Sequence, residues 1–227
     1  MTAVTTETTP TAAEQAIRRV AIIALLAILL GFVMQGLILG TKLAAGAPFP
    51  GMRLIVDLAQ GVTWSFLVCA GVGIGTTVAK GRAAIAGLIS ALFAPVAIAA
   101  AKSSQKVMAG LIGAADQPAV LSLATISVLR AIQYGILGWL LATLVQKGRQ
   151  TALPYLASGA GVGIIFGGTI AGLTYQATVA AGVQPGLPQI AASIVNEVIF
   201  PIGCATVIFV GQVVSRNLKT IIRSGGA

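Results

Sequence analysis

The sequence contains no histidine, only five acidic residues and only two cysteines. Histidine is the commonest general base and metal ligand in proteins, and it is a usual axial ligand of haem. Two cysteines are too few for a disulfide framework, and Cys69 and Cys204 both lie in apolar segments, where packing is their expected role. We therefore expect no enzymatic activity, no metal site and no cofactor in this chain.

Charge is also scarce, because charged residues make up 8% of the 227 residues whereas hydrophobic residues make up 57%. A soluble domain carries about 25% charged residues. The net charge of +9 would suggest nucleic-acid binding in a soluble protein, but the basic residues here stand at the ends of apolar segments. The composition indicates an all-α membrane protein whose main partner is the lipid bilayer, with no nucleic acid.

Six apolar segments are long enough to cross a bilayer, which takes about 20 residues in a helix. They are residues 18–44, 52–79, 83–102, 119–146, 152–181 and 188–214. The first exceeds the apolar region of a signal peptide, about 7–15 residues, so we expect it to remain as a membrane helix. The polar residues 102–106 predict the end of the third helix, with a separate interfacial turn at 107–115. This predicts a six-helix transmembrane domain at 17–216, a polar N-terminal tail at 1–16 and a basic C-terminal tail at 217–227.

Basic residues are divided unequally between the two ends of these segments. Nine lie at one end (Arg18, Arg19, Lys80, Arg82, Lys147, Arg149, Arg216, Lys219 and Arg223) and four at the other (Lys42, Arg53, Lys102 and Lys106). The side with more Lys and Arg is normally cytoplasmic. We therefore predict a multi-pass protein of the cell inner or plasma membrane with both termini in the cytoplasm.

A weak internal repeat with a period of about 67 residues runs along the chain. Two motifs recur at this spacing: Lys80-Gly81-Arg82 as Lys147-Gly148-Arg149, and Gln117-Pro118 as Gln184-Pro185. We interpret the period as three parallel helical hairpins at about 15–81, 82–148 and 149–215, related by a pseudo-threefold axis. Each proline, like Pro50, would occupy the first turn of an even-numbered helix. The alternative is that evenly spaced loops produce such a period in any six-helix protein.

Apart from Arg53 at the start of the second, three charged residues fall inside the predicted even-numbered helices: Asp57, Arg130 and Glu197. A charge at the bilayer centre costs about 2.5–3.5 kcal/mol on insertion scales, so such residues are functional by default. Arg130 and Glu197 are separated by the same interval as the recurring motifs, so they occupy equivalent repeat positions. We predict a polar site between the second, fourth and sixth helices, open to the outside, for a small charged or zwitterionic solute or an ion. The neighbours at helical spacing that would line it are Gln60, Thr63, Gln133, Tyr134, Ser193 and Asn196.

Two further features bear on helix packing. Gly159, Gly163 and Gly167 are spaced four apart in the fifth helix, which predicts close approach of another helix, with a glycine-lined passage as the alternative. Pro201 follows Glu197 by four residues, so it removes the hydrogen bond to the Glu197 carbonyl and predicts a kink.

These patterns leave two functional hypotheses. The first is a transport or solute-binding membrane subunit whose polar site contains Arg130, Glu197 and Asp57. The second is a non-catalytic structural subunit of a larger membrane complex or homo-oligomer. In the second hypothesis an Arg130–Glu197 ion pair only fixes helix packing, and Asp57 lies among lipid headgroups.

Overall fold

The computed structural model describes residues 11–79, 81–114 and 121–224, and its regular structure there is helical. The first four long helices are α1 (Ala12–Ala44), α2 (Arg53–Val78), α3 (Ala83–Leu111) and α4 (Leu123–Gln146). The fifth joins α5 (Ala152–Val162), the π-helical turn η1 (Gly163–Gly167) and α6 (Gly168–Ala180); the sixth joins α7 (Leu187–Ile194), the π-helical turn η2 (Val195–Ile199) and α8 (Phe200–Ser224). Among the described residues, six helices are long and apolar enough to span a membrane, which confirms the predicted helix count and the all-α class.

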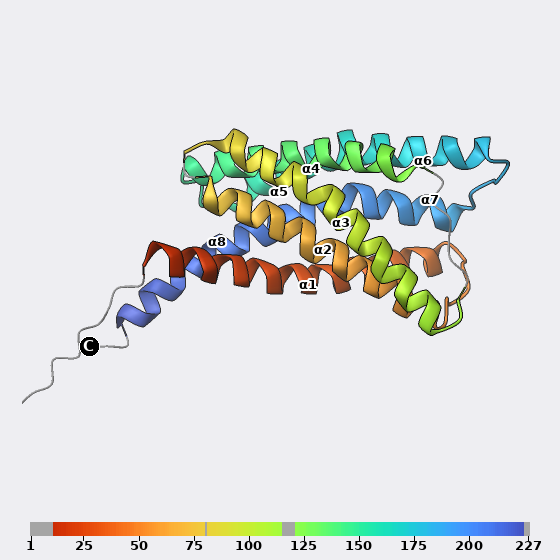
Figure 1. Cartoon of the computed structure of the whole chain (residues 1–227), viewed down its shortest axis with the longest axis horizontal. Helices are drawn as coiled ribbons and strands as arrows, with labels where there is room; N and C mark the ends of the chain where they lie inside the picture. The colour runs from red at the N-terminus through yellow and green to blue at the C-terminus, as the bar shows by residue number, and fades with distance from the viewer. Residues whose placement is uncertain (1–10, 80, 115–120, 225–227) are drawn as a thin grey trace, which may run out of the picture.

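The six helices run alternately in opposite directions, as Figure 1 shows. The α1–α2 and α6–α7 connections lie at one end of the bundle, on the right of the view, and the α2–α3 and α4–α5 connections lie at the other end. The start of α1 and the end of α8 are also at this second end. We call it the basic end, because Arg18, Arg82 and Arg149 lie in or beside these segments.

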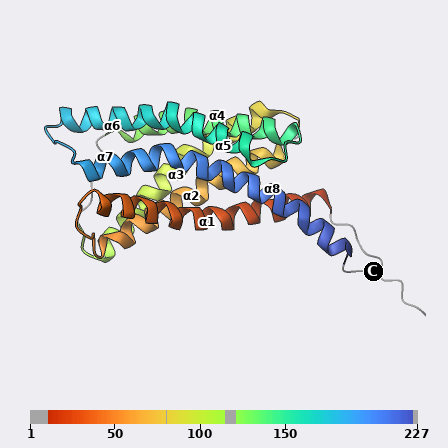
Figure 2. The ribbon, with the colours of Figure 1, turned by 180° about the vertical axis from the view of Figure 1, so that it is seen from behind.

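The helices form a closed ring in sequence order. Each long helix packs against the next, and the sixth packs against the first through contacts of α7, η2 and α8 with α1. Figure 2 shows α7 and α8 running beside α1. The second, fourth and sixth long helices also contact one another across the centre, because α2, α4 and α8 contact each other in pairs. Apolar side chains fill the interior, and Tyr134, Leu137 and Phe200 are among the largest that are fully buried.

The first, third and fifth of the six long helices terminate in the same way, on the side of the bundle opposite the basic end. Gly46 after α1, Gly113 after α3 and Gly182 after α6 all have positive φ, between 66° and 87°. In each case the glycine N–H bonds to a carbonyl three residues back, and the next N–H bonds five residues back, which satisfies the last carbonyls of the helix. Gly46 and Gly113 are separated by the interval of the sequence repeat, and Gly182 falls close to the next multiple of that interval.

The third helix is longer than the sequence indicated. The polar residues 102–106 neither end it nor leave a separate turn at 107–115, because α3 continues without a break to Leu111. Lysine, glutamine and alanine are good helix formers, so polarity alone does not stop a helix. The Lys102 ammonium also donates to Gln105 Oε1, 3.2 Å away and one turn along the helix. The sixth helix likewise runs beyond residue 214, to Ser224.

Two of the prolines predicted to lie in the first turn of the second, fourth and sixth long helices lie before those helices instead. Pro50 and Pro185 both precede their helices, which begin at Arg53 and Leu187. The first-turn position of α7 is instead occupied by Pro188. Pro118 lies outside the described residues, as do residues 119 and 120, the first two of the predicted fourth helix. The observed helix α4 begins at Leu123.

Candidate functional site

An ion pair joins the fourth and sixth helices inside the bundle. Arg130 Nη2 donates to Glu197 Oε1 at 2.6 Å, and the two side chains are only 8% and 9% exposed. The sequence had placed these two residues at equivalent repeat positions, and the structure puts them in contact. A buried ion pair survives desolvation only where further hydrogen bonds support it.

Two amides support the pair. Arg130 Nη1 donates to Gln133 Oε1 at 3.2 Å, one turn along α4. Asn196 Nδ2 donates to Glu197 Oε1 at 3.1 Å, so this carboxylate oxygen receives two donors. The predicted residues Gln133 and Asn196 therefore belong to the same polar cluster as Arg130 and Glu197.

An aromatic side chain that sequence analysis left out of the site covers the guanidinium. Arg130 Cζ lies 5.0 Å from the centroid of the Trp64 ring, within the range of a cation–π contact. Trp64 also meets the ring of Tyr134 edge to face, with centroids 5.6 Å apart. Trp64 is one helical turn beyond Gln60 on α2, and that spacing was the available signal for it.

The backbone around Glu197 departs from α-helical geometry. Glu197 lies in η2, and Pro201 follows at the start of α8. The backbone before the proline, which has no N–H to donate, therefore adopts a π-helical turn. The freed carbonyl of Glu197 lies against Gly167 of η1, and the carbonyl of Val198 lies against Gly163. Close packing, and not a passage, is therefore what these glycines provide.

A polar cavity of about 480 Å³ adjoins the ion pair. All six long helices contribute residues to its lining, and it lies toward the end of the bundle opposite the basic end. Its charged lining residues are Lys42, Asp57, Lys102, Arg130 and Glu197. This size is within the range of small-molecule pockets, about 300–1,000 Å³.

The cavity sorts the predicted site residues into two groups. Asp57, Gln60, Ser193 and Asn196 line it together with Arg130 and Glu197, whereas Thr63, Gln133 and Tyr134 do not. Among the described residues Asp57 forms no ion pair, so it does not flank Arg130 as a second counter-ion. Lys42 and Lys102 line the cavity but were treated only as orientation signals, because they stand near the ends of their helices.

One oxygen of the central carboxylate is left over. Glu197 Oε2 is buried and has no hydrogen-bond partner among the described residues, and the same is true of Gln133 Nε2. Buried polar atoms are nearly always paired, and Glu197 is a lining residue of the cavity, so this oxygen is available to accept a hydrogen bond from a donor that reaches it. The described residues contain no group of three or more His, Cys, Asp or Glu side chains that could hold a metal ion.

Comparison of the chain with protein-family models, with curated proteins and with solved structures finds no match.

Proposed function

We propose that the chain is an integral membrane protein with three helical-hairpin repeats and both termini in the cytoplasm. Support comes from the six apolar helices and from the exposed leucine, valine and phenylalanine side chains along α1, among them Leu25, Leu29, Phe32 and Val33. The excess of basic residues at one end supports the orientation. The closed ring of helices and the similar glycine ends at Gly46 and Gly113 support the repeat.

Its proposed activity is to bind a small zwitterionic or charged solute in the polar cavity and to carry it across the membrane. The observation that carries this proposal is the Arg130–Glu197 pair in the wall of that cavity, with Glu197 Oε2 lacking a donor. A buried carboxylate oxygen normally has a hydrogen-bond partner, and a ligand in the cavity could supply one. A solute with a cationic donor would satisfy Glu197, and its acidic group would face Lys42 and Lys102.

Binding is tested on purified protein in detergent by thermal unfolding against a panel of amino acids and other small zwitterions. A bound solute stabilises the fold in proportion to its occupancy, so the midpoint rises with concentration. Asp57→Asn and Gln60→Ala alter the cavity and leave the ion pair intact. We expect each to require about tenfold more solute for the same rise in the unfolding midpoint. Thr63→Ala on the same helix, outside the cavity, is the matched control.

Transport is tested by uptake of the stabilising solute into proteoliposomes. We expect uptake that Asp57→Asn reduces and Thr63→Ala leaves unchanged. If no solute in the panel stabilises the protein, or if stabilisation is the same in all three variants, the cavity is not a solute site.

A second candidate function is assembly into a larger membrane complex through α1. Gly36 and Gly40 stand four apart on this helix, and a β-carbon at either position would meet nothing within 4 Å. Small residues at this spacing let two membrane helices approach closely. If assembly is the function, the protein co-purifies with a stoichiometric partner or as an oligomer from native membranes. Gly36→Leu would then release it, whereas Gly110→Leu, at another open glycine, would not.

A further inference from the structure

The fifth and sixth helices are packed tightly along one half of their length. Gly159 faces α8 so closely that a β-carbon there would lie 2.7 Å from Ile202 Cα. Gly163 and Gly167 are equally confined by the backbone of η2. Beyond the two π-helical turns α6 and α7 remain in contact, but a space lies between their side chains.

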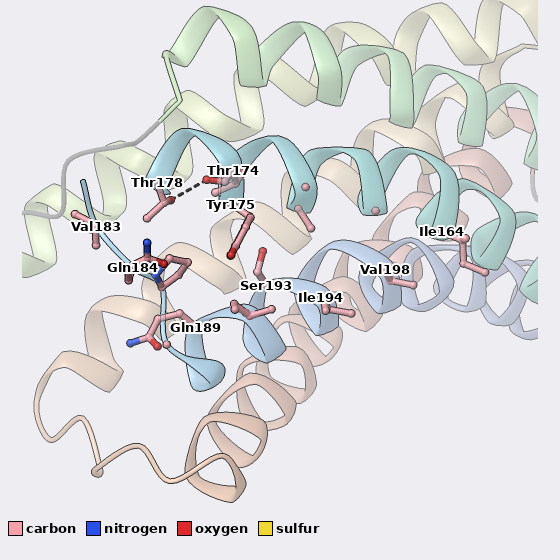
Figure 3. A pocket seen from close by; sticks show the side chains of 16 residues that line it. Ile164, Thr174, Tyr175, Thr178, Val183, Gln184, Gln189, Ser193, Ile194 and Val198 are labelled. Atoms are coloured by element: carbon pink, nitrogen blue, oxygen red, sulfur yellow. Dashed lines mark hydrogen bonds between the residues drawn. The ribbon is translucent and has the colours of Figure 1, made fainter. Parts of the chain in front are cut away.

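That space is a second, larger cavity of about 720 Å³ between α6 and α7. Figure 3 shows Tyr175 reaching into it from α6 and Ser193 from α7, while Ile194 and Val198 form its apolar side. Gly172 also lines it, and a β-carbon on this residue would meet nothing within 4 Å. A larger side chain at this position would therefore occupy part of the cavity.

Its walls are open to the surroundings of the bundle. Ile164, Tyr175 and Ile194 are between 45% and 64% exposed, so in a bilayer their side chains meet lipid. The cavity, which we call the lateral groove, is therefore an apolar cleft that faces the membrane.

The lateral groove and the polar cavity share part of their lining. Thr174 of α6 and Gln189 and Ser193 of α7 belong to both. On one side of these three residues lie the isoleucine and valine side chains of the groove, and on the other lie the charges around Arg130 and Glu197. The hydroxyl and amide groups at the boundary suit the ester or amide linkage of a lipid, which joins an apolar chain to a polar head.

We propose that the ligand is a membrane amphiphile, an acyl chain on a zwitterionic head, which enters from the bilayer between α6 and α7. This rests on the proposed solute-binding function and names its ligand class. The chain occupies the lateral groove. The cationic part of the head lies among the carboxylates of Glu197 and Asp57, and its anionic part faces Lys42 and Lys102.

The test compares two probes that share one head. The lipid probe is lysophosphatidylethanolamine with a photoactivatable diazirine in its acyl chain, and the soluble probe is glycerophosphoethanolamine. Gly172→Leu fills the groove and leaves the polar cavity unchanged, and Asp57→Asn alters only the head site. Gly161→Leu is the matched control, because Gly161 lies in the same long helix with open space beside it and lines neither cavity.

We expect the lipid probe to label residues of α6 and α7 in protein held in phosphatidylcholine nanodiscs. Gly172→Leu and Asp57→Asn should each reduce this labelling about tenfold, and Gly161→Leu should not change it. Labelling that Gly172→Leu reduces and Asp57→Asn does not would mean that the groove holds only a bulk lipid chain, and this inference would be overturned. If the soluble probe binds in an Asp57-dependent manner and lipid labelling ignores Gly172→Leu, the solute site stands and the amphiphile does not. If neither probe depends on Asp57, both proposals fail.

Discussion

The carbonyl oxygen of Glu197 occupies the place where a side chain of residue 167 would begin, so only glycine fits at Gly167. The same glutamate holds Arg130 with its carboxylate. The spacing between the fifth and sixth helices and the central ion pair therefore depend on one residue in one π-helical turn. A change at Gly167 should reach the polar cavity although Gly167 does not line it.

A methyl group at this point is the first test. We expect Gly167→Ala to destabilise the protein by about 1–3 kcal/mol, as overpacking of a close contact does. Gly168→Ala is the control, because nothing lies within 4 Å of a β-carbon there, and alanine should raise helix stability by up to about 1 kcal/mol. Both are measured by thermal unfolding in detergent. Equal effects of the two substitutions would show that the backbone contact at Gly167 does not govern the packing.

The ion pair should behave differently when one partner or both are removed. Arg130→Met leaves a buried carboxylate without a counter-charge, so we expect it to cost about 3–5 kcal/mol of stability. The double substitution Arg130→Met with Glu197→Gln removes both charges and should recover most of that loss. A double variant that is stable but binds no solute would separate the contribution of the pair to folding from its contribution to binding. If the double variant is as unstable as Arg130→Met, the two side chains do not act as a pair.

The two tryptophans of the chain provide a spectroscopic test of binding. Trp64 lines the polar cavity beside Arg130, whereas Trp139 is 48% exposed on the outside of the bundle. In a Trp139→Phe variant we expect the remaining Trp64 emission to change on addition of a stabilising solute. A Trp64→Phe variant, which retains Trp139, should show no change. A response from Trp139 alone would place binding outside the cavity.

Topology can be tested with thiol labelling on the native background. Cys69 and Cys204 are fully buried, so the unaltered protein should not react with a membrane-impermeant maleimide. Ala181→Cys and Gln150→Cys introduce exposed thiols at opposite ends of the bundle. We expect Ala181→Cys to react in intact cells and Gln150→Cys to react only after permeabilisation. Reaction of both in intact cells would contradict the predicted membrane crossing.

Composition and length were sufficient to predict the helices, because a bilayer requires about 20 apolar residues per crossing whatever their order. The same scarcity of polar residues identified Arg130 and Glu197, and their shared repeat position suggested that they lie together. The predicted end of α3 was wrong because lysine, serine and glutamine lower helix stability only slightly. The surroundings of the segment decide where the helix stops.

The rest of the site had weak signals in the sequence. Trp64 looks like any aromatic residue in an apolar helix until Arg130 is placed beneath its ring. Lys42 and Lys102 near the helix ends resemble ordinary interfacial lysines, and only the convergence of α1 and α3 brings them to one cavity. The lateral groove depends on where two helices separate, which follows from backbone contacts that are remote in sequence.

The π-helical turns also shift the angular positions of residues along the fifth and sixth long helices, which matters when these helices are aligned with those of another chain. Successive residues of a regular α-helix are rotated by about 100°, so an apolar stripe can be followed along its whole length. Because η1 and η2 have a wider winding, the angular positions of residues on α6 and α8 are offset from those on α5 and α7. Loss of one residue within either turn would restore uniform winding and rotate the remaining half-helix about its axis. Tyr175, or the side chains that follow Pro201, would then point toward different neighbours without any further substitution.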